Sequence, residues 1–277
     1  MLKGIDKLGK FYLHVGGIGD LFYTLSAGYD TEEEMMILSY ANNPEVIKEI
    51  LTHFPKVKSL VLKNNADYAE MSRVSEFAHS IAHLPKKLDY MNWPKYISDM
   101  KLEETTWVKE IPKKTLATKH VCIQPLGQGV GGGSGKHVGI HLNYWKLILQ
   151  AVRDSGFQPC VLGLPEDAAK YPREKQEDFS HLSLWDQFQY LMGSKMIISC
   201  DSWSKNLSLH AGIPTIVLKN FFIDFDQPVN DWKDPADPMF IDYWEDKGPI
   251  YPIEQKKAHS MAQLKDTIEK LLGGSSE

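Results

Sequence analysis

The stretch ISCDSWSKNLSLHAGIPTIVL, residues 198–218, contains a complete strand–helix–strand unit. It continues the apolar run MIISCDS (196–202), passes through SKNLSLHAG, which has the composition of a short helix, and ends in PTIVLKN (214–220), a second apolar run. Near-continuous apolar strands that alternate with helices are typical of parallel sheets covered on both faces. The stretch therefore predicts an α/β fold with parallel strands.

The same alternation occupies the rest of the second half of the chain. Apolar runs at 120–126 and 158–164 predict two more strands. NYWKLILQAVRDSG predicts a helix capped by Asn143 and ended by Gly156, and SLWDQFQYLMGS predicts another. The last helix is expected to begin at Ser260, in a capping box with Gln263. Its apolar face would consist of Met261, Leu264, Ile268 and Leu271.

The first half of the chain shows a second series of the same kind. Its predicted strands are KFYLHV (10–15), MMILSYA (35–41) and VKSLVLK (57–63). Its predicted helices start at Leu21, cover NPEVIKEILTHF with Asn43 as N-cap and Pro44 at the first helical position, and lie around 67–82. The two series meet near residue 116 and predict two Rossmann-like domains facing a cleft, 1–116 and 117–277. A single larger sheet is the alternative.

Composition indicates an ordinary globular protein, with 43% hydrophobic and 24% charged residues in 277. No apolar run approaches the roughly 20 residues of a transmembrane span. The N-terminus, MLKGIDKLGKF, lacks the apolar stretch of a signal peptide. We therefore expect a cytoplasmic protein with no transmembrane segment. Cys122, Cys160 and Cys200 lie in or beside strand-like runs without metal-site spacing, which predicts buried, reduced thiols.

The net charge of −5 is unevenly distributed. Residues 224–247 hold eight acids and two lysines, a net charge of −6. Residues 86–119 hold eight lysines and five acids, a net charge of +3. Four aromatic residues, Tyr90, Trp93, Tyr96 and Trp107, interleave with these lysines. That mixture would suit a negatively charged acceptor, and a solvated loop region is the alternative.

The glycine-rich stretch GQGVGGGSGKH, Gly127 to His137, does not fit a P-loop. The P-loop pattern requires a glycine at the position of Val130 and a serine or threonine at the position of His137. An ATPase or kinase site is therefore rejected. We expect instead a mobile lid over a ligand, with a solvent-exposed loop as the alternative.

Three further places carry candidate functional residues in the turns after predicted strands, where doubly wound folds bind ligands. HVGGIGDLFYTLSA (14–27) fails as a dinucleotide fingerprint because Phe22 occupies the third glycine position. Gly17 and Gly19 would allow another molecule to approach the backbone closely. Asp20 is either a general base or a helix N-cap, and His14 either touches ligand or is packed.

The turn at 201–205 is the second place. Asp201 and Ser202 stand at the start of a helix, where free N–H groups can hold an anion, and Lys205 adds a positive charge. A capped surface helix is the alternative. In GLPED (163–167), Glu166 could accept hydrogen bonds from ribose hydroxyls, and Asp167 could be a helix cap.

These motifs resemble the heptosyltransferase-like glycosyltransferases of glycosyltransferase family 9. GDLFYTLSA resembles the N-terminal Gly-Asp motif of that family. DSWSKNLSLHAGIP matches its Asp-Thr-Gly-x-x-His-Leu-Ala-Ala-Ala-x-Gly-x-Pro motif without gaps. Asp201, Ser202, Leu207, Gly212 and Pro214 fall in register. The resemblance covers about 118–220 well and 10–28 in outline.

The chain departs from the family at two motif positions, where Trp203 replaces a glycine and Asn206 replaces the histidine. A tryptophan there would reshape or stack on the donor pocket, so the resemblance does not carry over the heptose donor. The resemblance further implies that Lys136 helps to hold the donor diphosphate.

The resemblance implies a GT-B arrangement that performs glycosyl transfer. The 1–116 domain would bind the acceptor, and the 117–277 domain would bind a nucleotide-sugar donor. Asp20 would deprotonate the acceptor hydroxyl in a single inverting displacement that needs neither metal nor cofactor. Helix N–H groups near Ser202, with Lys136 or Lys205, would stabilise the leaving diphosphate.

Several alternatives stay open. The acceptor is either a cell-envelope glycan or a modified base in DNA, the latter suggested by 86–119 and opposed by 224–247. A non-catalytic nucleotide-sugar-binding protein is a third possibility. A nucleotide-dependent oxidoreductase is disfavoured by the failed fingerprint.

Overall fold

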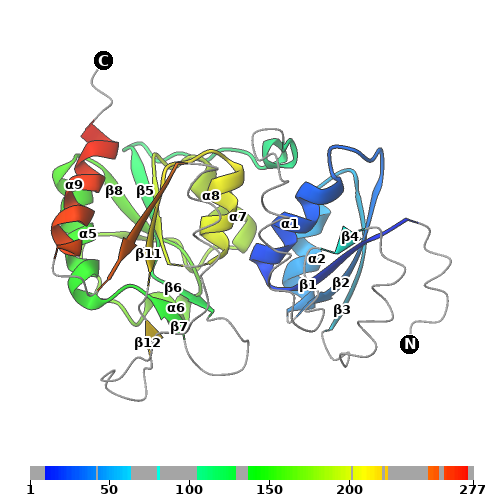
Figure 1. Ribbon diagram of the computed structural model, residues 1–277, viewed down its shortest axis with the longest axis horizontal. Helices are drawn as coiled ribbons and strands as arrows, with labels where there is room; N and C mark the ends of the chain where they lie inside the picture. Colours follow the sequence, from blue (N-terminus) through cyan, green and yellow to red (C-terminus); the bar gives the residue numbers. More distant parts are fainter. Residues whose placement is uncertain are drawn as a thin grey trace. The chain divides into compact units, whose positions relative to one another are not determined.

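The structure is a computed structural model. It describes residues 10–41, 43–63, 80–81, 105–128, 137–200, 202–219, 222–223, 249–255 and 259–273. The chain divides into two compact units, Met1–Ile111 and Pro112–Glu277 (Figure 1). The sequence analysis placed this division at residue 116. Each unit contains its own parallel sheet.

Unit 1 contains a four-stranded parallel sheet in the order β3-β2-β1-β4. Its strands are β1 (Tyr12–Gly16), β2 (Met35–Ala41), β3 (Val57–Lys63) and β4 (Ser80–Ile81), and its helices are α1 (Ile18–Gly28) and α2 (Pro44–Thr52). The predictions for β2, β3 and α2, including Pro44 at its first position, are confirmed. Helix α1 begins three residues before the predicted Leu21. Ser80 and Ile81 form a strand, so the helix predicted around 67–82 is wrong there, and its residues 67–79 and 82 lie outside the described part.

The core of unit 1 is closed by a short 3-10 helix, η3 (Trp107–Glu110), far along the chain from the strands it covers. The Trp107 side chain is fully buried and stacks on Phe22 of α1, with ring centroids 5.2 Å apart and an interplanar angle of 10°. Its Nε1–H donates to Ser26 Oγ at 2.8 Å. Phe54 meets the same indole edge-on. Trp107 is therefore a core residue, although the sequence grouped it with aromatic residues that could face an acceptor.

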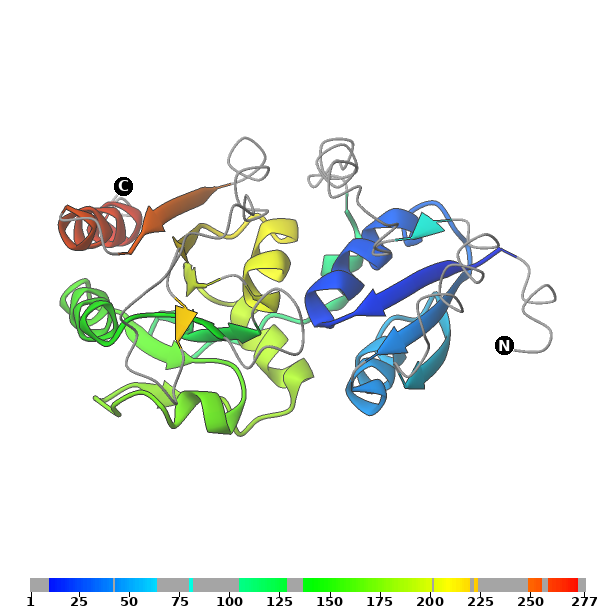
Figure 2. The same ribbon diagram turned by 60° about the horizontal axis from the view of Figure 1, so that its bottom comes forward.

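Unit 2 contains a six-stranded parallel sheet in the order β13-β11-β10-β5-β8-β9. The strands are β5 (His120–Gln124), β8 (Gln158–Val161), β9 (Glu177–Asp178), β10 (Ile197–Ser199), β11 (Thr215–Lys219) and β13 (Ile250–Glu254). The helices are α5 (Leu142–Asp154), α6 (Pro165–Ala168), α7 (Leu184–Met192), α8 (Trp203–His210) and α9 (Ser260–Gly273). Figures 1 and 2 show α5 and α9 on one face of the sheet and α7 and α8 on the other. This is the doubly wound arrangement that the sequence predicted.

The glycine-rich stretch is flanked by a pair of antiparallel strands. Strands β6 (Leu126–Gln128) and β7 (His137–Gly139) pair in the register Leu126↔Gly139, and β12 (Phe222–Ile223) extends β7 on its other edge. Helix α5 begins only after this pair. A P-loop requires a strand, a loop and then directly a helix, so the geometry agrees with the rejection of a P-loop. Residues 129–136, on which the expected lid depends, lie outside the described part.

Helix α9 packs on α5 within unit 2, and its buried residues are Ser260, Leu264, Ile268 and Leu272. The predicted apolar face was wrong in one member, because Met261 is 37% exposed and Leu272 takes the buried position. The predicted capping box is also wrong, because the Ser260 hydroxyl donates to the Glu254 carbonyl instead.

The ends of α5 show one prediction confirmed and one corrected. Gly156 follows the helix with a φ of +79°, as expected for a terminating glycine. The N-cap is His141 rather than Asn143, because His141 Nδ1 accepts a hydrogen bond of 3.1 Å from the Asn143 N–H.

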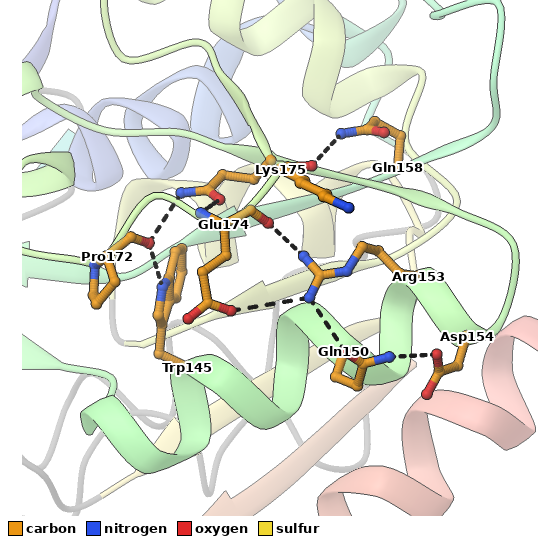
Figure 3. A network of polar contacts seen from close by, with 9 residues as sticks. Trp145, Gln150, Arg153, Asp154, Gln158, Pro172, Glu174 and Lys175 are labelled. Carbon is orange, nitrogen blue, oxygen red and sulfur yellow. Dashed lines mark hydrogen bonds and ion pairs between the residues drawn. The ribbon is translucent and has the colours of Figure 1, made fainter.

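A network of polar contacts ties α5 to the loop between α6 and β9 (Figure 3). Arg153 donates to the Glu174 carbonyl and to Gln150 Oε1, and Trp145 Nε1–H donates to the Pro172 carbonyl at 3.1 Å. Lys175 lies in the same loop with a φ of +57°, and its carbonyl accepts from Gln158 at 3.2 Å. The loop is thus held in one conformation, although a non-glycine residue adopts a left-handed backbone there.

The segment that leads from unit 1 into unit 2 is anchored on both sides. Ile111 is 2% exposed, and its N–H donates to the Val108 carbonyl of η3. Three residues later, the Lys114 N–H donates to the Gln189 carbonyl of α7 at 2.9 Å, and Lys114 Nζ pairs with Asp186. The Lys114 carbonyl packs so closely on Gly193 that a Cβ at Gly193 would lie 1.9 Å from it. Gly193 is therefore required by this docking.

The three cysteines are free and buried, which confirms the prediction from the sequence. Cys122 and Cys160 lie opposite each other on β5 and β8. Burial raises the pKa of the Cys122 thiol to about 12 and also raises the pKa of the Cys160 thiol. Among the helices in the described ranges, none has the length and apolar character needed to cross a membrane.

Candidate functional site

In each unit, the candidate residues lie where the strand order reverses. In unit 1 the chain runs from β1 to β2 and β3 on one side and then places β4 on the other side of β1. In unit 2 it runs from β5 to β8 and β9, and then places β10 on the other side of β5. The carboxyl ends of strands at such a switch point form the usual ligand crevice of doubly wound sheets.

In unit 1, the turn after β1 holds Asp20 at the third position of α1. Gly17 is the N-cap, and its backbone N–H donates to Asp20 Oδ2 at 2.8 Å. Within the described residues, Asp20 Oδ1 accepts no hydrogen bond. The carboxylate is partly exposed. Asp20 is therefore not the N-cap of α1, which was the alternative to a general base. One of its oxygens accepts from the N-cap backbone as the third residue of a capping box.

His14, in β1, contacts the backbone of the turn between β1 and α1. Its Nε2 lies 3.0 Å from the Gly17 carbonyl and its Nδ1 lies 2.7 Å from Ser39 Oγ. A carbonyl can only accept, so Nε2–H donates to the Gly17 carbonyl. The side chain is fully buried. His14 is a packed histidine that positions the Gly17 carbonyl, and the expectation that it touches ligand is not supported.

In unit 2, a cluster of three serines joins the end of β10 to the start of α8. Ser199, Ser202 and Ser204 have their hydroxyl oxygens 2.7–3.0 Å apart. Ser202 is the N-cap of α8 with extended backbone angles, as expected from the sequence. Asp201 lies outside the described residues, as does Lys136.

Gln124 connects this cluster to the end of β5. Its Oε1 accepts from the Ser204 N–H at 3.3 Å, and its Nε2 donates to the Leu126 carbonyl at 3.1 Å. The side chain is 4% exposed. The sequence analysis missed Gln124, although a polar residue that ends an apolar strand at a switch point is a readable signal.

The residues of α8 that the sequence selected are more buried than expected. Lys205 is 1% exposed and Asn206 is 9% exposed, so neither lies on an open face of the helix. The Trp203 ring contacts Phe188 of α7, with centroids 5.0 Å apart. Trp203 therefore packs between α8 and α7, and the roles of these three residues in donor binding stay predictions.

The third part of the unit 2 site follows β8. Gly163 has a φ of +118°, which is a conformation that favours glycine, and Pro165 starts α6. Glu166 is exposed in the first turn of α6. Asp167 pairs with Lys170 at 3.2 Å rather than capping the helix, whose N-cap is Leu164. Glu166 thus stands free of protein partners among the described residues, at the same edge of the sheet as Gln124.

In the described part of the chain, no group of three or more His, Cys, Asp or Glu side chains is placed to hold a metal ion. The chemical groups that the described residues present at the two switch points are carboxylates, hydroxyls, amides and backbone N–H groups. In unit 1 they can take up a proton, and in unit 2 they can hydrogen-bond a polar or anionic ligand.

Comparison with solved structures identifies the class of fold. The chain has the α/β fold of GT-B glycosyltransferases, in agreement with the prediction. Neither a protein-family model nor a curated protein sequence matches the chain.

Three solved structures illustrate the similarity. One is a glycosyltransferase family 9 protein from Veillonella parvula, 11% identical over 97% of this chain and 99% of that chain, with a TM-score of 0.56. A second is the E. coli heptosyltransferase WaaC with ADP-2-deoxy-2-fluoro heptose, 11% identical over 96% of this chain and 100% of that chain, with a TM-score of 0.55. A third is described as a UDP-N-acetylglucosamine 2-epimerase from Listeria monocytogenes, 10% identical over 97% of this chain and 89% of that chain, with a TM-score of 0.52.

Proposed function

We propose that the protein is a nucleotide-sugar-dependent glycosyltransferase that moves a sugar to an acceptor hydroxyl with inversion. The observation that carries this proposal is the position of the candidate residues at the switch points of the two sheets. Asp20 lies at the switch point of unit 1, and Ser202, Gln124 and Glu166 lie at that of unit 2. The fold is shared with heptosyltransferases, one of which was solved with an ADP-sugar analogue. A shared fold does not fix a reaction, so the residues at the sites carry the argument.

Unit 2 is the proposed donor unit. A diphosphate is attracted to unpaired N–H groups at a helix start, and a ribose needs hydrogen-bond acceptors. The start of α8 supplies backbone N–H groups, among which that of Ser204 already donates to Gln124 Oε1, and the exposed Glu166 carboxylate supplies hydrogen-bond acceptors. Lys136, Asp201 and Lys205 complete the proposed donor set as predictions. We propose that these protein groups, without a metal ion, stabilise the leaving diphosphate.

Unit 1 is the proposed acceptor unit, with Asp20 as general base. Its capped oxygen fixes the carboxylate, and its second oxygen would take the proton from the attacking hydroxyl. General-base assistance of this kind is worth about 10²–10⁴-fold in rate. A single displacement at the anomeric carbon breaks the bond to the diphosphate on the opposite face and therefore inverts the configuration.

The acceptor class that we propose is a cell-envelope type of glycan. The DNA alternative drew on aromatic residues in 86–119, and one of them, Trp107, is buried in the core of unit 1. Tyr90, Trp93 and Tyr96 lie outside the described residues. The salt dependence of activity distinguishes the two acceptors. Binding to DNA phosphates releases counterions, so activity on DNA would fall steeply between about 50 and 200 mM salt.

The first test is thermal unfolding with a panel of nucleotide sugars and nucleoside diphosphates, with and without EDTA. A ligand at about 100 times its Kd stabilises the folded state by roughly 2.7 kcal/mol, which is readily measured. We expect a selective shift that EDTA leaves unchanged. Glu166→Ala should reduce the shift, and Glu269→Ala on the exposed face of α9 is the matched control. No shift with any member would refute the donor site.

Product analysis then separates the reaction classes. A glycosyltransferase releases free nucleoside diphosphate only in proportion to sugar transferred or hydrolysed. An epimerase instead converts the donor into an isomeric nucleotide sugar without an acceptor, and a binding protein leaves the donor intact. Either of the last two results would refute the proposed reaction while keeping the donor site.

A further inference from the structure

The loop that carries Glu166 is held by one buried amide side chain from a distant helix. Gln187 lies in α7 and is 3% exposed. Its Oε1 accepts from the Gly163 N–H at 2.8 Å, and its Nε2 donates to the Gly163 carbonyl at 3.1 Å. The second hydrogen of Nε2 goes to the Leu182 carbonyl at 3.2 Å. Both donor hydrogens and the acceptor oxygen of this amide are therefore engaged.

The two hydrogen bonds between the Gln187 amide and Gly163, called the clamp below, begin where the ladder between β8 and β5 ends. The Leu162 N–H still donates to the Ile123 carbonyl of β5 at 2.8 Å, so the ladder between β8 and β5 continues to that residue. At Gly163 the φ turns to +118°, and the amide of Gln187 replaces the neighbouring strand. The backbone of Gly163 is thus fixed in direction as well as in position.

Glu166 has little freedom beyond the clamp. Pro165 has a fixed φ and begins α6, whose first turn is closed by the Asp167 and Ala168 N–H groups on the Leu164 carbonyl, both at 3.0 Å. Only Leu164 and Pro165 separate the clamped Gly163 from Glu166. The direction in which the Glu166 carboxylate leaves the sheet edge therefore depends on Gln187.

We propose that Gln187 is a positioning residue that aims the Glu166 carboxylate at the ribose hydroxyls of the donor nucleotide. The inference rests on the proposed function, since it assigns the ribose contact to Glu166. Gln187 does not touch the nucleotide itself. Its loss should leave phosphate and base contacts in place while the discrimination for ribose hydroxyls disappears.

The test is the ratio of Kd values for a 2′,3′-dideoxynucleoside diphosphate and for its parent, measured by titration calorimetry with ADP, UDP, GDP and CDP. Hydrogen bonds to a carboxylate typically change affinity by about tenfold or more, so the wild-type ratio should be of that order for the diphosphate that binds. Gln187→Met removes the three hydrogen bonds with little change in shape. It should bring the ratio close to one while the Kd of the dideoxy analogue stays unchanged.

Two further variants make the result specific. Glu166→Ala should give the same ratio as Gln187→Met, and the double variant should not lower it further, because both changes remove one contact. Gln189→Met is the matched control: Gln189 is a buried glutamine of the same helix whose side chain makes none of the contacts with Gly163. It should keep the wild-type ratio.

The outcomes separate the two proposals. If Gln187→Met keeps the wild-type ratio, Gln187 only stabilises the fold and the inference is overturned while the donor site stands. The inference is equally overturned if Gln187→Met weakens parent and dideoxy analogue alike. If the wild-type protein binds none of the four diphosphates, the proposed function is refuted, and the inference that rests on it is refuted as well.

Discussion

The backbone N–H of Gly17 donates to Asp20 Oδ2 at 2.8 Å, so the proposed catalytic base also caps the helix on which it lies. In the proposed mechanism, capping and catalysis use different oxygens of one carboxylate. An asparagine keeps an oxygen that can accept from Gly17, but it cannot take up a proton. The two roles can therefore be separated by the choice of substitution.

We expect Asp20→Asn to lower the transfer rate about 10²–10⁴-fold because the general base is lost. Asp20→Ala should lower the rate as well and should also cost about 0.5–2 kcal/mol of stability, since the cap is lost. The rate is measured with the donor selected by the thermal panel, and stability by denaturant unfolding. An Asp20→Asn variant with the wild-type rate would show that Asp20 is only a cap.

A second prediction concerns the core of unit 1. Trp107→Ala should destabilise this unit by about 3–5 kcal/mol, because it removes a fully buried indole that stacks on Phe22. Ser26→Ala removes the partner of Nε1 together with the hydrogen bond that Ser26 Oγ donates to the Phe22 carbonyl, and should cost about 0.5–1.5 kcal/mol. Urea unfolding monitored by tryptophan fluorescence and by circular dichroism measures both. Equal stability of Trp107→Ala and the wild type would contradict the assignment of Trp107 to the core.

A third prediction uses the left-handed backbone of Lys175. Lys175→Gly removes the steric cost of that conformation, about 1–2 kcal/mol, and adds chain entropy to the unfolded state. We expect the variant to be at least as stable as the wild type, by thermal unfolding. Lys146→Gly in the interior of α5 is the matched control and should cost about 1 kcal/mol. Equal losses in the two variants would contradict the proposed relief of strain.

A fourth prediction concerns pH. Burial lowers the pKa of His210 to about 4, whereas a histidine in the unfolded chain titrates near its usual value of 6.5. Between these values the unfolded state binds more protons, so stability is present above about pH 6.5 and is lost as the pH falls toward 4. The full loss from this residue is about 3 kcal/mol.

His210→Gln should remove most of this pH dependence when urea midpoints are compared from pH 7 to pH 4.5. Burial also lowers the pKa of His120, so a remaining slope of the same sign is expected in that variant. A wild-type slope in His210→Gln would contradict the assignment.

The sequence predicted the strands and helices well where apolar periodicity was local. The predictions for β2 and β3 matched in full and that for α2 matched at its start, because each is a short apolar or amphipathic run with a clear boundary. Helix α2 ends at Thr52, two residues before the end of the predicted run. The pairing of β6 with β7 was not predicted, since its strands are short and joined by glycines that carry no periodicity. The burial of Trp107 was not predicted either, because it depends on a contact more than eighty residues away along the chain, with Phe22.

The candidate site shows the same division. The positions of Asp20 and Ser202 at the start of a helix after a strand were predicted, because the sequence marks such boundaries, whereas their roles stay predictions. Gln187 was missed because a glutamine inside a helical pattern looks like a solvent-facing residue, and only the fold brings it to Gly163. Lys205 was expected to add a positive charge at an anion site, and its burial, at 1% exposed, was not predicted.

The anchored segment between the units has a mechanical consequence. Ile111 is fixed in unit 1 and Lys114 in unit 2, so the torsional freedom of the covalent connection resides in Pro112 and Lys113. The pyrrolidine ring holds the φ of Pro112 at about −65°, which leaves only a few soft bonds. Any rotation of one unit against the other through this connection is therefore a change in a few identifiable torsion angles, rather than a bend spread along a flexible tether.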